Sequence, residues 1–132
     1  MHIKKLDHVG IRVMDADKSM QFYTTLGFHI TRKDYEEQVF VVKHSSGIEI
    51  NLIAHGDNSF DQQNILMDVE ERYPGYTHYA IEVESVLDAK AFFESIDIKI
   101  SGGPVTFGDG KTSNFIRDPD LNDIEFTELP AS

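Results

Sequence analysis

The stretch DHVGIRV, residues 7–13, resembles a second stretch of the same chain, THYAIEV, residues 77–83, and the two have His, Ile and Val at matching positions. A constant shift along the sequence superposes the two stretches and many of the apolar residues that follow them. The superposed pairs include His8 and His78, Ile11 and Ile81, Val13 and Val83, Phe22 and Phe92, and Ile30 and Ile100. Similarity of this kind at a fixed shift indicates a duplicated structural unit.

Each copy opens with the alternation of a half-buried strand and continues with the spacing of an amphipathic helix. Asp15 is a candidate N-cap and Gly27 a stop signal for the first helix, and Ser85 or Asp88 starts the second. Three short β-rich runs follow each helix, at residues 28–33, 37–44 and 47–54 in the first half and 98–101, 111–118 and 122–129 in the second. The pattern predicts an α+β protein in which each half is a βαβββ module.

The length of 132 residues suits one domain and is too short for two independent cores. We therefore expect a single domain over 1–132, with module one at about 1–55, a linker at about 56–75 and module two at about 76–130. The linker has no clean period, and we expect at most one short helical turn in it, around residues 65–69.

Composition excludes several classes of function. The net charge of −11, from 12 Lys and Arg against 23 Asp and Glu, repels nucleic-acid phosphates and anionic lipids. There is no Cys, so disulfides and thiolate sites are excluded and any metal must be held by His, Asp or Glu. No apolar run is long enough to span a bilayer, and the opening MHIKKLDH lacks the apolar stretch of a signal peptide. We expect a cytoplasmic protein whose charge suits a cationic or metal-bound partner.

Four polar residues lie on one face of the predicted strands, and the strand residues on the other face, such as Val9, Ile48, Tyr79 and Ile124, are apolar. The four polar residues are His8, Glu49, His78 and Glu125. A single His or Glu on a strand is usually polar filler, but here each half carries a His in its first strand and a Glu in its last. A slightly larger shift aligns Ile48-Glu49-Ile50 with Ile124-Glu125-Phe126, and the longer loop GGPVTFGDGK accounts for the difference. Two imidazoles and two carboxylates are a suitable ligand set for a borderline divalent metal.

The chain resembles the vicinal oxygen chelate superfamily, which includes glyoxalase I, bleomycin resistance proteins and dioxygenases. The resemblance rests on LDHVGIRVMDADKSMQFYTTLGF at residues 6–28, on THYAIEV, and above all on FIRDPDLNDIEFTEL at residues 115–129. It implies two βαβββ modules that form a cupped, partly open mixed β-barrel with the helices outside. It also implies a homodimer, in which the metal site is built either from both modules of one chain or from modules of two chains.

The same resemblance implies the site. Glyoxalase I carries His, Glu, His and Glu as metal ligands, and the matching residues here are His8, Glu49, His78 and Glu125. The metal would be nickel or zinc, with cobalt, manganese or iron as alternatives, one ion per site. Arg12 matches an arginine near the glutathione end of the glyoxalase substrate. Asn51 is a second candidate substrate-binding residue, although it does not stand where glyoxalase I has its polar residue.

The implied activity is that of a metal-dependent lyase or isomerase. The metal chelates two neighbouring substrate oxygens, while Glu49 and Glu125 move a proton between adjacent carbons through an enediolate. The substrate would be a small molecule, possibly a glutathione adduct. Alternatives are a ring-cleaving extradiol-type dioxygenase, an isomerase like methylmalonyl-CoA epimerase, and a sequestering protein of the bleomycin-binding type.

Overall fold

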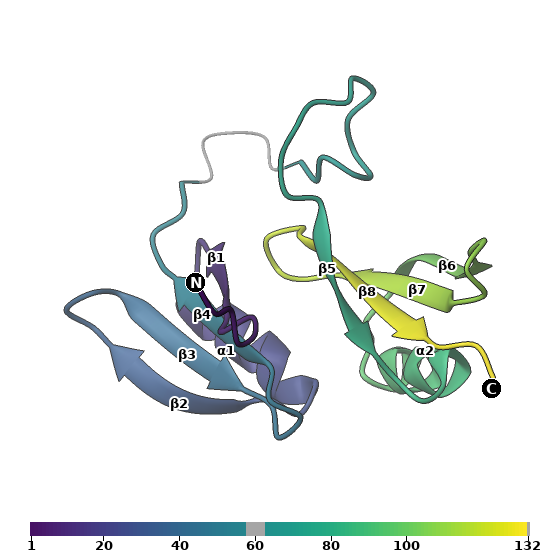
Figure 1. The fold of residues 1–132 in the computed structure, drawn as a ribbon. Helices are drawn as coiled ribbons and strands as arrows, with labels where there is room; N and C mark the ends of the chain where they lie inside the picture. Colours follow the sequence, from purple (N-terminus) through teal and green to yellow (C-terminus); the bar gives the residue numbers. More distant parts are fainter. Residues whose placement is uncertain (58–62, 132) are drawn as a thin grey trace. The chain divides into compact units, whose positions relative to one another are not determined.

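A computed structural model describes residues 1–57 and 63–131 of the chain (Figure 1). The chain divides into two compact units, Met1–Asp61 and Gln62–Ser132. We call them module one and module two and describe each by itself. No helix within the described residues has the length and the apolar character needed to cross a membrane.

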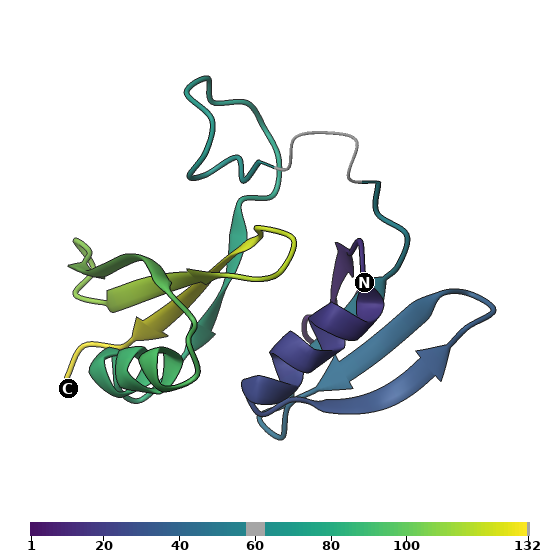
Figure 2. The same ribbon diagram turned by 180° about the vertical axis from the view of Figure 1, so that it is seen from behind.

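Module one is a four-stranded sheet with one helix on it. Its strands lie in the order β1-β4-β3-β2, with β1 parallel to β4 and the other pairs antiparallel. Its elements are β1 (Val9–Arg12), α1 (Ala16–Thr25), β2 (His29–Asp34), β3 (Val39–Lys43) and β4 (Glu49–Ile53). The helix lies along one face of this sheet, as Figure 2 shows.

Module two repeats this arrangement. Its strand order is β5-β8-β7-β6, and β5 again runs parallel to its neighbour, β8. Its elements are β5 (His78–Glu82), α2 (Val86–Ser95), β6 (Ile100–Thr106), β7 (Thr112–Arg117) and β8 (Asp123–Glu128). The α+β class and the two βαβββ modules are therefore confirmed. The two sheets are separate and not closed into a barrel, and the cupped arrangement of the modules stays a prediction.

The helices begin and end where the sequence signals predicted. The side chain of Asp15 accepts hydrogen bonds from the amides of Asp17 and Lys18, at 3.0 and 3.2 Å, and Ser85 caps α2 in the same way. Gly27, with φ of +96°, follows the last turn of α1 and takes the left-handed conformation that a helix C-terminus favours. These local signals fix the position of each helix over its sheet.

One face of each sheet is the core and the other carries the polar residues. In module one the side chains against α1 are fully buried, among them Val42, Ile50 and Leu52. Strand residues alternate between faces, so His8, Glu49 and Asn51 lie on the opposite face, which we call the open face. The matching face of module two, which we also call its open face, carries His78 and Glu125, but Ser113, Phe115 and Asp123 on that face are buried. The sheets thus bring all the candidate side chains to the faces away from the helices.

The turn between the last two strands has the same length in both modules, which corrects the alignment made from the sequence. The amide of His44 donates to the carbonyl of Ile48 at 2.9 Å, and the amide of Asp118 donates to that of Asn122 at 3.0 Å. The shift that superposes His44 on Asp118 superposes Asn51, and not Glu49, on Glu125. The parallel pairs agree, since Val9 lies opposite Ile50 and Tyr79 opposite Ile124.

The expected equivalence of Glu49 and Glu125 is therefore wrong by two positions. Glu49 is the structural counterpart of Asp123. Both strands contain an Ile-Glu pair, and in the sequence these two pairs match better than the residues that the structure superposes. A slip of two residues keeps each side chain on its face of the sheet, so the prediction that Glu49 lies on the open face is unaffected.

Asp118 organises the turn before β8. Its carboxylate accepts hydrogen bonds from the amides of Asp120 and Asn122 and from the side chain of Asn122, each at 2.9 Å. Burial raises the pKa of Asp118 to about 6. The turn is therefore built around a carboxyl group that the fold holds out of water.

Residues 63–75 of the expected linker belong to module two, and its residues 58–62 lie outside the described part of the chain. Asn64 starts a single hydrogen-bonded turn, with its side-chain oxygen accepting from the amides of Leu66 and Met67. Arg117 donates to both oxygens of Asp68, at 2.8 and 2.9 Å, and this bond lowers the pKa of Asp68 to about 2. The predicted helical turn around residues 65–69 is thus one turn of chain attached to β7.

The β6 backbone comes close to β7 at Gly103. The φ of Gly103 is +84°, and a Cβ added there would lie 2.5 Å from the carbonyl oxygen of Ser113. The φ of Gly47 is also positive, at +102°, but a Cβ there would meet nothing within 4 Å. A close approach of two backbones, and not only a turn, therefore requires the glycine at 103.

Candidate metal centre

The open face of module two holds a histidine and a carboxylate in direct contact. His78 is the first residue of β5, and Glu125 lies on the neighbouring strand β8, directly opposite Ala80. Nε2 of His78 lies 2.9 Å from Oε1 of Glu125. Both side chains are largely covered, with 27% and 16% of their surface exposed. The pair is predicted from the sequence, and within module two the structure brings its members together.

A hydroxyl group stands at each end of this pair. Oγ1 of Thr77 lies 2.8 Å from Nδ1 of His78, and the Oγ of Ser113 donates to Oε2 of Glu125 at 2.7 Å. An ionised carboxylate only accepts hydrogen bonds, so Nε2 of His78 is the donor to Glu125. In neutral His78, Nδ1 then accepts from Thr77. Four side chains thus form one continuous hydrogen-bonded row.

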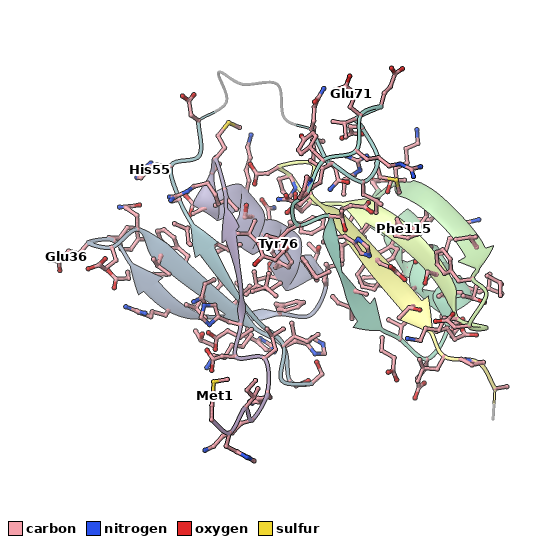
Figure 3. All side chains as sticks on the ribbon, turned by 45° about the horizontal axis from the view of Figure 1, so that its top comes forward. Met1, Glu36, His55, Glu71, Tyr76 and Phe115 are labelled. Atoms are coloured by element: carbon pink, nitrogen blue, oxygen red, sulfur yellow. The ribbon has the colours of Figure 1, made fainter. Side chains whose placement is uncertain are left out.

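Two further side chains border this row. The ring of Phe115 packs against His78, with the ring centroids 6.2 Å apart, and Figure 3 labels Phe115 on β7. Asp123 is buried opposite His78, and its burial raises its pKa. Nε of Arg117 lies 3.7 Å from Oδ1 of Asp123. The guanidinium therefore compensates part of the charge buried beside the pair.

The open face of module one also gathers metal-ligand types. Donor atoms of Asp7, His8 and Glu49 all lie within 4.8 Å of one another. Nδ1 of His8 is 2.8 Å from Asp7, and this hydrogen bond lowers the pKa of Asp7. The nitrogen of His8 that remains for a metal is therefore Nε2. Glu49 also forms an ion pair with Lys43 at 3.2 Å.

The two candidate substrate-binding residues lie on this same face. Nη1 of Arg12 donates to the carbonyl oxygen of Ala54 at 2.8 Å, so one of its five donors is used inside the module. Asn51 occupies the place that Glu125 has in module two. Its side-chain oxygen is buried and has no hydrogen-bond partner among the described residues. A buried oxygen of this kind is suited to a ligand or an ion.

The donors in module two fit a divalent metal. Ligand atoms about 2.1 Å from an ion and about 90° apart are about 3 Å from one another. The spacing of 2.9 Å between Nε2 of His78 and Oε1 of Glu125 matches this value. A metal-bound His78 would carry its proton on Nδ1 and donate a hydrogen bond to the hydroxyl of Thr77. A hydrogen bond from the second ring nitrogen is typical of histidines that bind a metal.

The sequence reasoning missed Ser113, Thr77 and Asp7. A Ser in a strand or a Thr before one carries no periodic signal, because such residues are common on polar faces. Asp7 precedes His8 directly, and sequence neighbours on a strand point to opposite faces. The structure shows that Asp7 and Thr77 each contact the histidine that follows them, and that Ser113 contacts Glu125 across two strands.

Comparison with known proteins extends the picture from the site to the whole chain. Residues 5–126 match the model of the Glyoxalase/Bleomycin resistance protein/Dioxygenase superfamily. No curated protein matches the chain. An integron cassette protein from the mobile metagenome of Halifax Harbour sewage outfall is similar at 27% identity and a TM-score of 0.76, over 96% of this chain and 100% of that one.

Two solved structures with lower identity share the fold. A glyoxalase family protein from Enterococcus faecalis has 23% identity and a TM-score of 0.80, over 97% of this chain and 100% of that one. A lactoylglutathione lyase from Agrobacterium tumefaciens has 20% identity and a TM-score of 0.70, over 96% of this chain and 94% of that one.

Proposed function

Since the chain belongs to the Glyoxalase/Bleomycin resistance protein/Dioxygenase superfamily, we propose that it is a divalent-metal-dependent lyase or isomerase of the glyoxalase type. The observation that carries the proposal is the contact between His78 and Glu125 at 2.9 Å. A nitrogen and a carboxylate oxygen at this spacing could both bind one ion, with the histidine proton moved from Nε2 to Nδ1.

The proposed ligands are His78 and Glu125 from module two and His8 and Glu49 from module one. Asn51 on β4 is an alternative to Glu49 as the fourth metal ligand, because Asn51 is the counterpart of Glu125. Glu49 would bring a negative charge, whereas Asn51 would bring a neutral oxygen that already lacks a partner. Comparing Glu49→Gln with Asn51→Ala in a metal-binding measurement identifies the fourth ligand, since only its loss weakens binding.

The proposed roles follow from the chemistry of each side chain. A bound divalent ion would act as a Lewis acid on a substrate carbonyl and acidify the neighbouring C–H bond. Glu125 or Glu49, released from the metal, would take that proton as a general base and return it to the adjacent carbon as a general acid. The order in which the two carboxylates act is not part of the proposal. Arg12 has further N–H groups with which to bind an anionic part of the substrate.

The proposed substrate is a small molecule with two neighbouring oxygens, and a glutathione hemithioacetal is the first to test. The similarity to a lactoylglutathione lyase supports the fold alone at 20% identity, so the substrate rests on the resemblance of the site residues. A homodimer and a cytoplasmic location stay predictions.

Metal analysis of the purified protein tests the proposal. We expect one nickel or zinc ion per chain in the wild type and strong loss of metal in His8→Ala and His78→Ala. His29→Ala is the matched control, because His29 lies exposed on β2 and is not a proposed ligand. Unchanged metal content in His78→Ala would contradict the proposal.

A second activity is favoured by the position of Asn51. If Asn51 and not Glu49 binds the metal, the ligands are two histidines, one carboxylate and a neutral amide oxygen. Two histidines and one carboxylate are the ligands that hold ferrous iron in many oxygenases. An extradiol-type dioxygenase would consume oxygen when the iron-loaded protein is given a catechol. Oxygen uptake with a catechol, together with no turnover of hemithioacetals, would replace the lyase proposal by this one.

A further inference from the structure

We infer that Ser113 is a positioning residue that fixes the carboxylate of Glu125 for metal binding. The inference rests on the proposed function, because it gives Ser113 a role through Glu125. Nothing in the sequence pattern assigns Ser113 a role, and its assignment depends on contacts within module two.

The first argument is burial. The side chain of Ser113 is fully buried, and its Oγ donates to Oε2 of Glu125 at 2.7 Å. A buried hydroxyl is not exchanged freely with water, so this donor holds one orientation. A hydrogen bond to an ionised acceptor is also among the stronger kinds in proteins.

The two carboxylate oxygens of Glu125 have different partners. Ser113 binds Oε2, whereas Oε1 faces Nε2 of His78. A carboxylate held in this way presents one defined oxygen beside the imidazole. A Glu side chain is otherwise flexible, and partners behind a ligand orient the donor and tune its metal affinity.

The third argument comes from the other module. The register that makes Asn51 the counterpart of Glu125 makes Val39 the counterpart of Ser113, since Val39 lies opposite Ile53 and Ser113 opposite Thr127. The hydroxyl and the carboxylate are thus present together in module two and absent together at the matching positions of module one. A hydroxyl whose role is to hold a carboxylate is expected only where that carboxylate is present.

The test measures cobalt binding to the full-length protein after removal of metal with a chelator. Titration with Co²⁺ alone, followed by visible absorption, reports both the dissociation constant and the ligand geometry. We expect Ser113→Ala to weaken Co²⁺ binding by about 10- to 100-fold, the range for lost partners of metal ligands, and to change the absorption spectrum. Ser113→Thr keeps the hydroxyl and should restore both.

Thr127→Val is the matched control. Thr127 is also buried, lies directly opposite Ser113 on β8, and its hydroxyl has no partner within the described part of the chain. Replacing it removes a buried hydroxyl without removing a hydrogen bond, so Co²⁺ affinity should not change. If Ser113→Ala does not fold, Ser113→Cys takes its place, because its weak donor should give an intermediate loss.

Three outcomes are distinguishable. Weaker binding in Ser113→Ala with rescue by Ser113→Thr supports the inference. Wild-type affinity in Ser113→Ala, alongside loss of binding in Glu125→Gln, overturns the role of Ser113 and leaves the proposed function standing. Absence of Co²⁺ binding by the wild type overturns both.

Discussion

Modules one and two share the same strands, helix and register, but they differ at the positions of Glu125 and Ser113, where module two has a carboxylate that accepts a hydrogen bond from a buried hydroxyl. The row in module two is Thr77, His78, Glu125 and Ser113. At the positions of Glu125 and Ser113, module one has Asn51 and Val39. The duplicated scaffold therefore sets where side chains lie, while the residues at two matching positions decide which module holds a buried hydroxyl bonded to a carboxylate.

The modules also differ in how they hold their last two strands. Arg117 binds Asp68 through two hydrogen bonds and lies 3.7 Å from buried Asp123. Its counterpart in module one is Lys43, which forms an ion pair with Glu49 at 3.2 Å and is half exposed. The stronger network attaches the chain before β5 to the sheet that carries His78 and Glu125.

The largest effect should come from Glu125→Gln. Loss of the proposed base is expected to lower turnover by roughly 10²- to 10⁴-fold, the usual contribution of a positioned acid or base. Glu82→Gln is the control, because Glu82 is an exposed glutamate on β5 and its loss removes the same charge. Steady-state rates with a hemithioacetal substrate measure the effect, and equal rates in both variants would contradict the assignment.

The next effect concerns stability. Arg117→Met releases Asp68 and leaves buried Asp123 without its cation. The uncompensated buried carboxyl group should lower the free energy of unfolding by roughly 1–3 kcal/mol. Urea denaturation at neutral pH measures it. A change below about 0.5 kcal/mol, the level of ordinary surface substitutions, would show that the network does not support module two.

A pH dependence should follow from Asp118. Its pKa in the folded state, about 6, is above its ordinary value of 3.8. Between these values the folded chain holds more protons than the unfolded chain, so the free energy of unfolding falls as pH rises from about 4 to about 6. Asp118→Asn should flatten this part of the curve.

Thermal unfolding at several pH values checks this prediction. The control Asp109→Asn, at an exposed turn of the same module, should keep the wild-type slope. Asp68 acts in the opposite direction and at lower pH. Its pKa is lowered to about 2, so its stabilising contribution is lost as pH falls below about 4.

The smallest effect should be that of Lys43→Met. An exposed ion pair contributes about 0–1 kcal/mol, and Lys43 and Glu49 form such a pair in module one. Urea denaturation should therefore place this variant close to the wild type. An effect as large as that of Arg117→Met would remove the difference in stability networks between the modules.

Much of the fold was predictable because its signals are local. The alternation around His8 and His78, the caps Asp15 and Ser85, and Gly27 after the first helix each act within a few residues. The faces of the strands were also predictable, since the period of two survives an error in alignment. For this reason the placement of Glu49 and Glu125 on open faces holds, although their equivalence was wrong.

The rest could not be predicted because it depends on contacts between strands. The equivalence of Asn51 and Glu125 follows from the hydrogen bonds of two turns, and the bond between Ser113 and Glu125 joins β7 to β8. A serine or an asparagine in a strand has no pattern that distinguishes a positioning residue from surface filler. Asp68 and Arg117 are likewise far apart in the sequence.

The close approach of β6 to β7 has a consequence for how this chain can vary. Gly103 lies against the backbone of Ser113, and any side chain there would push on the strand that carries the hydroxyl. If position 103 is randomised and functional variants are selected, we expect all of them to have glycine at this position. Gly47, which has open space around it, should also accept asparagine or aspartate. The turn at Gly47 in module one can therefore vary in sequence, while the contact of β6 with β7 at Gly103 in module two cannot.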